Sequence, residues 1–275
     1  MTPCRPRPLN RRSSNLHLPL PPFVGRLYAP REVQERRPGL LIIGGSGGGM
    51  PWERARAAAT AGVPSVAIAY FKAPGLPGSL KAISLEYFRD ALEWLSGLQG
   101  VDPNRLVVMG ISRGSEAALL TGVHFSGQVA AVVALAPGNV VLGSWPPGGP
   151  AWTLNGSPLR FVRVSDLTPR SEMRSSPSRA SRPRSHSSVP GATKSGLRWQ
   201  WRALLRTGVG AAGRQHQDDL LLEYTLAGHD VGAVAPGGGG TAAPSRTSED
   251  NPRTDDAWPR LLQFIRAVPS RGSRD

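Results

Sequence analysis

The sequence predicts an α/β fold with a mainly parallel sheet and helices on both faces of that sheet. Between residue 23 and about residue 164, short runs of aliphatic residues alternate with helical stretches, which is the order of strands joined by crossover helices. Several of these runs are continuously apolar, as strands covered on both faces should be. The chain has 275 residues, enough for one large domain.

Each element follows from its own pattern. The apolar runs predict strands at 23–29, 40–43, 65–70, 106–109 and 129–135. Apolar residues at helical spacing predict helices at 52–61, 84–98 and 114–123, the second with Ser84 as its N-cap. Later in the chain we expect a strand with a His-bearing loop and a last helix, at 219–230 and 256–268.

The net charge of +14 is concentrated in two segments. Residues 1–22 carry +4 and residues 168–215 carry +9, which leaves the rest nearly neutral. Within 168–190, 17 of 23 residues are Arg, Ser or Pro, too polar to form a core. We therefore expect a disordered basic leader (1–22), a domain over 23–268 interrupted by the low-complexity segment 168–215, and a tail (269–275).

Composition also excludes several functions. Neither basic segment interleaves aromatic residues with its charge, so we expect no nucleic-acid partner. No apolar run is long enough to span a membrane and the start of the chain lacks the apolar region of a secretory signal, which predicts no membrane partner and a cytoplasmic location. Cys4 is the single cysteine, and no metal or organic cofactor is expected.

The segment Gly110-Ile111-Ser112-Arg113-Gly114 lies between a predicted strand and a predicted helix. In an α/β-hydrolase this context forms a nucleophile elbow, where small neighbours allow a strained turn that exposes the serine hydroxyl. The string alone occurs by chance in many proteins, and a structural glycine turn is the alternative. The strand–turn–helix context favours Ser112 as a nucleophile.

A glycine-rich loop, 44–49, follows the strand at 40–43. In hydrolases such a loop supplies an oxyanion N–H group, and a plain flexible turn is the alternative. Phosphate binding is disfavoured, because a P-loop ends in Gly-Lys-Ser/Thr and a dinucleotide loop with glycines at 45 and 47 needs a third at position 50, which is Met50.

His229 is the histidine best placed to act as a catalytic base. It follows a predicted strand late in the chain, in the hydrolase order of serine, acid and histidine. The other four histidines are His17 in the leader, His186 and His216 in or beside the low-complexity segment, and His124 at the end of the helix at 114–123. A surface loop histidine is the alternative reading.

Three stretches, 44–62, 65–95 and 107–120, carry a recognisable set of short motifs: Ala69-Tyr70-Phe71, Leu76-Pro77, Leu85-Glu86-Tyr87-Phe88 and Gly-Ile-Ser-Arg-Gly. With these motifs the stretches together resemble the C-terminal catalytic domain of the acyl-CoA thioesterase and bile-acid-CoA:amino acid N-acyltransferase family, within the dienelactone-hydrolase-like α/β-hydrolases. The resemblance covers about 23–164 and 219–268, without the family's N-terminal immunoglobulin-like domain. It implies an acyl-Ser112 intermediate, His229 as general base, and oxyanion N–H groups from Arg113 with Gly47 or Gly48. The amide-forming branch resembles this pattern with cysteine as nucleophile, so serine indicates hydrolysis.

The resemblance also implies a catalytic Asp after a strand between about 170 and 200, and that motif is missing. A frameshift would explain its loss, since in an adjacent frame Gly191–Arg198 reads as Gly-Asp-Gln-Val-Trp-Pro-Pro with permitted codons. The catalytic acid is therefore unknown, with Asp166, Asp218 and Asp219 as the nearby candidates. Loss of the acid in a triad costs about 10⁴-fold in kcat.

The sequence thus predicts a serine hydrolase that cleaves a thioester, with acyl-CoA as the substrate class implied by resemblance, impaired by loss of its acid. Two alternatives remain: a dienelactone-hydrolase-like carboxylesterase acting on esters, and a catalytically inactive frameshifted product. The sequence does not predict the acyl chain or the oligomeric state.

Overall fold

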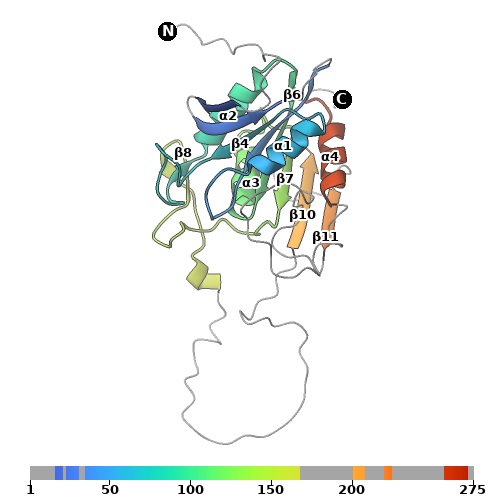
Figure 1. Ribbon diagram of the computed structural model, residues 1–275. Coiled ribbons are helices and arrows are strands. Elements are labelled where there is room, and N and C mark those ends of the chain that lie inside the picture. The colour runs from blue at the N-terminus through green and yellow to red at the C-terminus, as the bar shows by residue number, and fades with distance from the viewer. Residues whose placement is uncertain are drawn as a thin grey trace, which may run out of the picture.

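The computed structural model describes residues 16–20, 23–30, 35–167, 201–207, 220–224 and 257–271. These residues form an eight-stranded sheet in the order β1-β2-β4-β3-β6-β7-β10-β11 (Figure 1). The strands are β1 (Leu16–Leu20), β2 (Phe23–Tyr28), β3 (Arg37–Ile43), β4 (Ser65–Ala69), β6 (Val101–Ile111), β7 (Ala131–Leu135), β10 (Trp201–Thr207) and β11 (Leu220–Tyr224).

The centre of the sheet is parallel and its two sides are antiparallel. Strands β4, β3, β6 and β7 pair in parallel. Strand β2 pairs antiparallel with β1 and β4, and β10 pairs antiparallel with β7 and β11. Parallel neighbours require crossover connections, which the helices supply.

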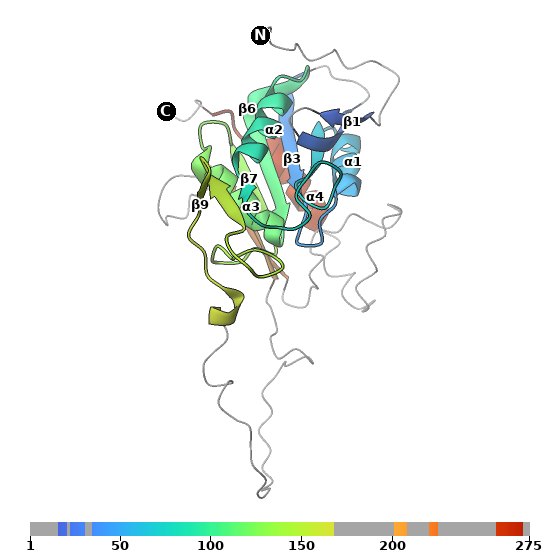
Figure 2. The ribbon, with the colours of Figure 1, turned by 90° about the vertical axis from the view of Figure 1, so that its left-hand side faces the viewer.

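Helices cover both faces of this sheet. Helices α2 (Glu86–Ser96) and α3 (Arg113–His124) pack on one face, and α1 (Trp52–Thr60) and α4 (Ala257–Ala267) pack on the other (Figures 1 and 2). Strand β3 shows why two cores form: alternate side chains of a strand point to opposite faces, so Leu41 and Ile43 join one cluster while Leu40 and Ile42 join the other. This architecture confirms the predicted α/β-hydrolase-type fold.

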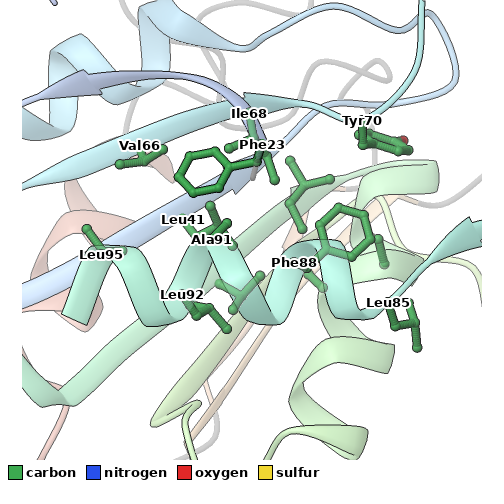
Figure 3. Close-up of a cluster of buried hydrophobic side chains, with 14 of the residues drawn as sticks. Phe23, Leu41, Val66, Ile68, Tyr70, Leu85, Phe88, Ala91, Leu92 and Leu95 are labelled. Atoms are coloured by element: carbon green, nitrogen blue, oxygen red, sulfur yellow. The ribbon is translucent and has the colours of Figure 1, made fainter. Parts of the chain in front are cut away.

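Figure 3 shows how α2 is held against its face of the sheet. Phe88, Leu92 and Leu95 recur at intervals of three or four and are buried completely. They meet side chains of β3 and β4 in one cluster, in which Leu41 and Ile68 are also fully buried. The helical period predicted from the sequence therefore marks the face that packs.

The helix boundaries agree with the sequence within a few residues, with one correction. Leu85, rather than Ser84, is the N-cap of α2, because Ile83–Ser84 forms a short strand, β5. The hydroxyl of Ser84 still accepts a hydrogen bond from the N–H of Glu86 at 3.2 Å. Strand β5 belongs to a small second sheet with β8 (Trp152–Leu154) and β9 (Ser157–Pro158), and a 3-10 helix, η1 (Val164–Leu167), follows.

Two strands lie where the sequence predicts no folded structure. Strand β1 falls within the expected leader, 1–22, and β10 falls within the expected low-complexity segment, 168–215. Strand β1 pairs with β2, and β10 pairs with β7. Residue composition does not reveal such pairing. The remainder of these two segments lies outside the described residues. Within the described ranges, none of the helices combines the length and apolar character needed to cross a bilayer.

Four parallel strands end on the same edge of the sheet. The residues that directly follow them are Gly44 after β3, Tyr70 after β4, Ser112 after β6 and Ala136 after β7. In open α/β sheets, ligands bind at the carboxyl ends of the strands. This edge is therefore where a site is expected.

Candidate active site

Ser112 occupies a sharp turn between strand β6 and helix α3. Its backbone has φ 54° and ψ −118°, in a region that residues other than glycine rarely adopt. The N–H of Ser112 donates to the carbonyl oxygen of Leu135 at 2.8 Å, and its own carbonyl accepts from the N–H of Ser115 at 2.9 Å. Backbone strain of this kind is concentrated at functional sites, where the surrounding structure maintains it.

The two glycines of the motif are required by close backbone contacts. A methyl group on Gly110 would lie 1.9 Å from the carbonyl oxygen of Gly114, and one on Gly114 would lie 2.4 Å from the carbonyl oxygen of Gly44. Any larger residue would therefore push α3 away from β6 or from the end of β3. The Gly-x-Ser-x-Gly spacing thus has a steric cause in this chain, as the interpretation of a strained strand-to-helix turn requires.

The glycine-rich loop lies beside Ser112, and Gly45 is the residue that approaches it. A methyl group on Gly45 would lie 3.4 Å from Cβ and 4.0 Å from Oγ of Ser112. The N–H of Gly48 donates to the carbonyl of Gly45 at 3.3 Å, so that group is engaged within the loop. Around Gly47 there is open space. The loop named from the sequence therefore lies beside Ser112, its oxyanion role stays a prediction, and the structure adds Gly45 as the glycine that approaches the serine.

Tyr70 fixes the start of this loop. Its hydroxyl donates to the carbonyl oxygen of Gly44 at 2.9 Å and lies 3.4 Å from that of Gly45. The side chain is 1% exposed, and burial raises the pKa of Tyr70 well above its ordinary value. The hydroxyl therefore remains a protonated donor across the physiological range. In the sequence Tyr70 appeared only as one mark of a resemblance.

A buried ion pair lies directly after the turn. Nη1 of Arg113 is 2.9 Å from Oε2 of Glu116, and the two side chains are only 11% and 8% exposed. Nη2 of Arg113 donates to the carbonyls of Leu142 at 3.0 Å and Gly143 at 2.9 Å. Oε1 of Glu116 accepts from the N–H of Leu142 at 3.0 Å and from Nε1 of Trp152 at 2.5 Å. The pair thus attaches the segment from Leu142 to Trp152 to α3.

Burial controls the pKa of both members of this pair. It raises the pKa of Glu116 and lowers that of Arg113, while their mutual attraction acts in the opposite direction. Desolvation therefore exceeds the attraction for each of them, as is common for buried ion pairs. The guanidinium of Arg113 also lies 5.8 Å from the ring centroid of Trp152. These three side chains therefore contact one another directly after the turn at Ser112.

Most of the remaining predicted site residues lie outside the described residues. These are His229 and the acid candidates Asp218 and Asp219. Asp166 is described: it is exposed on η1, and its carboxylate accepts a hydrogen bond from the hydroxyl of Ser165 at 3.1 Å. Among the side chains that the structure places, no group of three His, Cys, Asp or Glu could hold a metal ion.

The central part of the chain matches a known protein family. Residues 83–145 match the family described as BAAT / Acyl-CoA thioester hydrolase C terminal. The resemblance predicted from the sequence is confirmed. This segment contains Ser112, Arg113 and Glu116, together with α2, β6, α3 and β7.

Individual relatives of that family are moderately similar. Rat acyl-coenzyme A thioesterase 1 is 34% identical over 96 residues, 35% of this chain and 23% of the relative. Human acyl-coenzyme A thioesterase 2, mitochondrial, is 34% identical over 109 residues, 40% of this chain and 22% of the relative. The match thus spans about a quarter of the length of these relatives.

Solved structures also match this chain in part. The α/β hydrolase GrgF from Penicillium sp. sh18 has 20% identity and a TM-score of 0.37, covering 42% of this chain and 41% of its own. A protein from Klebsiella pneumoniae titled as a putative dienelactone hydrolase has 15% identity and a TM-score of 0.33, covering 40% and 53%. The fold assignment above depends on the strand order and helix packing of the chain itself.

Proposed function

We propose that this chain is a serine hydrolase that cleaves a thioester through an acyl-Ser112 intermediate. The observation that carries the proposal is the backbone of Ser112, which is held in a left-handed conformation at the carboxyl edge of a parallel sheet by two close-packed glycines. Such a turn exposes a serine hydroxyl in front of the N-terminus of a helix, where a nucleophile and developing negative charge are both favoured.

The proposed reaction proceeds in two steps. Oγ of Ser112 attacks the thioester carbonyl while His229 accepts the hydroxyl proton, and the proton then passes to the leaving thiolate. Water, deprotonated by the same histidine, hydrolyses the acyl-serine and releases the carboxylic acid. The N–H of Arg113, at the first position of α3, and the N–H of Gly47 in the glycine-rich loop would stabilise the oxyanion of each tetrahedral intermediate, since the N–H of Gly48 is already bonded to Gly45.

Acyl-CoA is the proposed substrate class because relatives that match part of this chain are named acyl-coenzyme A thioesterases. The proposed partner is accordingly a small acyl thioester. A carboxylesterase acting on simple esters would use the same nucleophile and is distinguished only by the leaving group. The cytoplasmic location stays a prediction, and the human, mouse and rat acyl-coenzyme A thioesterases 2 among the relatives are named as mitochondrial.

The activity of this exact chain depends on an acid that has not been identified. In a triad the acid orients the base, and without it we expect kcat about 10⁴-fold lower than in an intact enzyme. The nucleotide sequence across codons 160–220 tests the frameshift hypothesis directly. An adjacent frame that encodes Asp-Gln-Val-Trp-Pro supports an impaired product, whereas stop codons in that frame remove the hypothesis.

The experiment that tests the proposed function is release of free CoA thiol from an acyl-CoA by the full chain. We expect release with the wild type and none above background with Ser112→Ala. Ser96→Ala is the matched control, since Ser96 is a half-buried residue at the end of α2 and its hydroxyl donates to the carbonyl of Glu93 in the same helix. Faster turnover of a short aryl ester than of acyl-CoA would favour the carboxylesterase. Equal rates for wild type and Ser112→Ala would contradict the proposal.

A further inference from the structure

The carbonyl group of Gly44 lies in a narrow space between two parts of the candidate site. On one side it faces α3, because a methyl group on Gly114 would meet the Gly44 oxygen at 2.4 Å. On the other side it accepts the hydrogen bond from the hydroxyl of Tyr70 at 2.9 Å. Gly44 is buried, and a buried carbonyl deprived of its partner is costly. The position of the glycine-rich loop therefore depends on this hydroxyl.

The ring of Tyr70 is held by aromatic neighbours. Trp152 stacks on it with a centroid distance of 5.9 Å and an interplanar angle of 30°, while Phe71 and Phe88 make edge contacts at 4.9 and 5.5 Å. Figure 3 shows Tyr70 at the end of the cluster that contains Phe88. Because these neighbours are fully buried, the hydroxyl has little freedom to leave Gly44.

The same ring connects the loop to the helix after Ser112. Trp152 donates its indole N–H to Glu116, and Glu116 pairs with Arg113, the residue next to Ser112. A continuous set of contacts therefore runs from α3 through Glu116, Trp152 and Tyr70 to the loop. In the proposed mechanism the two oxyanion donors come from the two ends of this set, the start of α3 and the glycine-rich loop.

We propose that Tyr70 is a positioning residue that sets the distance between the glycine-rich loop and Ser112, and so the geometry of the oxyanion site. The inference rests on the proposed function for its catalytic consequence. It assigns Tyr70 no contact with substrate; the hydroxyl acts through the Gly44 carbonyl. A displacement of catalytic groups by about 1 Å costs about 10²-fold in rate, so loss of one anchoring hydroxyl has a large expected effect.

The test compares Tyr70→Phe with Tyr87→Phe in the full chain. Tyr87 is a matched control because its hydroxyl also donates to a backbone carbonyl, that of Ala69 at 2.6 Å, and accepts from the N–H of Val24 at 2.9 Å. Neither of these two hydrogen bonds of Tyr87 involves the glycine-rich loop. We expect Tyr70→Phe to lower kcat and the rate of labelling by a fluorophosphonate about 10- to 100-fold with little change in KM, and Tyr87→Phe to leave both rates within about threefold.

Hydrogen exchange of the peptide that contains residues 44–50 provides a readout that does not need activity. The inference predicts exchange about tenfold faster in Tyr70→Phe and unchanged in Tyr87→Phe. The inference would be overturned if Tyr70→Phe matched the wild type in kcat, labelling rate and hydrogen exchange. It would also be overturned if Tyr70→Phe and Tyr87→Phe lost the same fraction of kcat and labelling rate. If the wild type is neither labelled nor active, the proposed function fails, and the exchange comparison alone decides whether Tyr70 positions the loop.

Discussion

Replacement of Glu116 by alanine would remove three contacts at once. Its carboxylate pairs with Arg113 at 2.9 Å and accepts hydrogen bonds from the N–H of Leu142 and the indole of Trp152. Arg113 would remain as a buried charge without this partner, since the pair is about nine-tenths buried. Breaking a buried ion pair by removal of one partner costs about 3–5 kcal/mol, because the remaining charge stays desolvated. For a domain of this size the loss corresponds to about 6–20 °C in Tm.

Urea unfolding followed by tryptophan fluorescence measures this loss, and a thermal scan checks its direction. Glu93→Ala is the control: Glu93 is exposed on α2, and its replacement should change the free energy of unfolding by less than about 0.5 kcal/mol. A free energy of unfolding for Glu116→Ala within about 1 kcal/mol of the wild type would refute the reasoning. It would mean that the pair is solvated, and that the segment from Leu142 to Trp152 is held by other contacts.

Two further predictions concern the same region. Gly114→Ala should lower the free energy of unfolding by about 1–3 kcal/mol and slow fluorophosphonate labelling, because the new methyl group meets the Gly44 carbonyl at 2.4 Å. Gly127→Ala is the control and should do neither, because nothing lies within 4 Å of a methyl group there. Equal effects of the two substitutions would contradict the close contact at Gly114. Burial raises the pKa of Glu116 in the folded chain. The free energy of unfolding of the wild type relative to Glu116→Gln should therefore be greatest below pH 4.5 and decline as pH rises through the raised pKa. A difference that increases with pH in urea unfolding would contradict this prediction.

The sequence predicted the parts of the fold that local patterns determine. Continuous apolar runs indicated β3, β4, β6 and β7, and helical spacing of Phe88, Leu92 and Leu95 indicated the buried face of α2. Strand β10 was missed, because its assignment depends on pairing with β7, far away in the chain, and because it shares a segment with the Arg-, Ser- and Pro-rich residues 168–190. The composition of the whole segment 168–215 does not reveal a strand of only seven residues within it.

The candidate site was predictable to a similar degree. Ser112 followed from a short motif in a strand–turn–helix context, and the structure shows the strained turn there. Tyr70 and Trp152 could not be found as a pair, since they are 82 positions apart and meet only after β4 and β8 are placed. The proximity of Gly45 to Ser112 could not be predicted, because glycine repeats give no indication of which residue lies nearest the serine, and the oxyanion role of Gly47 or Gly48 stays a prediction. The role of His229 remains a prediction.

The measurement that tests the central claim most directly is mass spectrometry of the full wild-type chain after reaction with a fluorophosphonate. The reagent modifies a serine only where the hydroxyl is activated, and digestion locates the adduct. We expect one adduct, on the peptide that contains Ser112, and its loss in Ser112→Ala. An adduct on another serine, or none on folded protein, would contradict the assignment of Ser112 as the nucleophile.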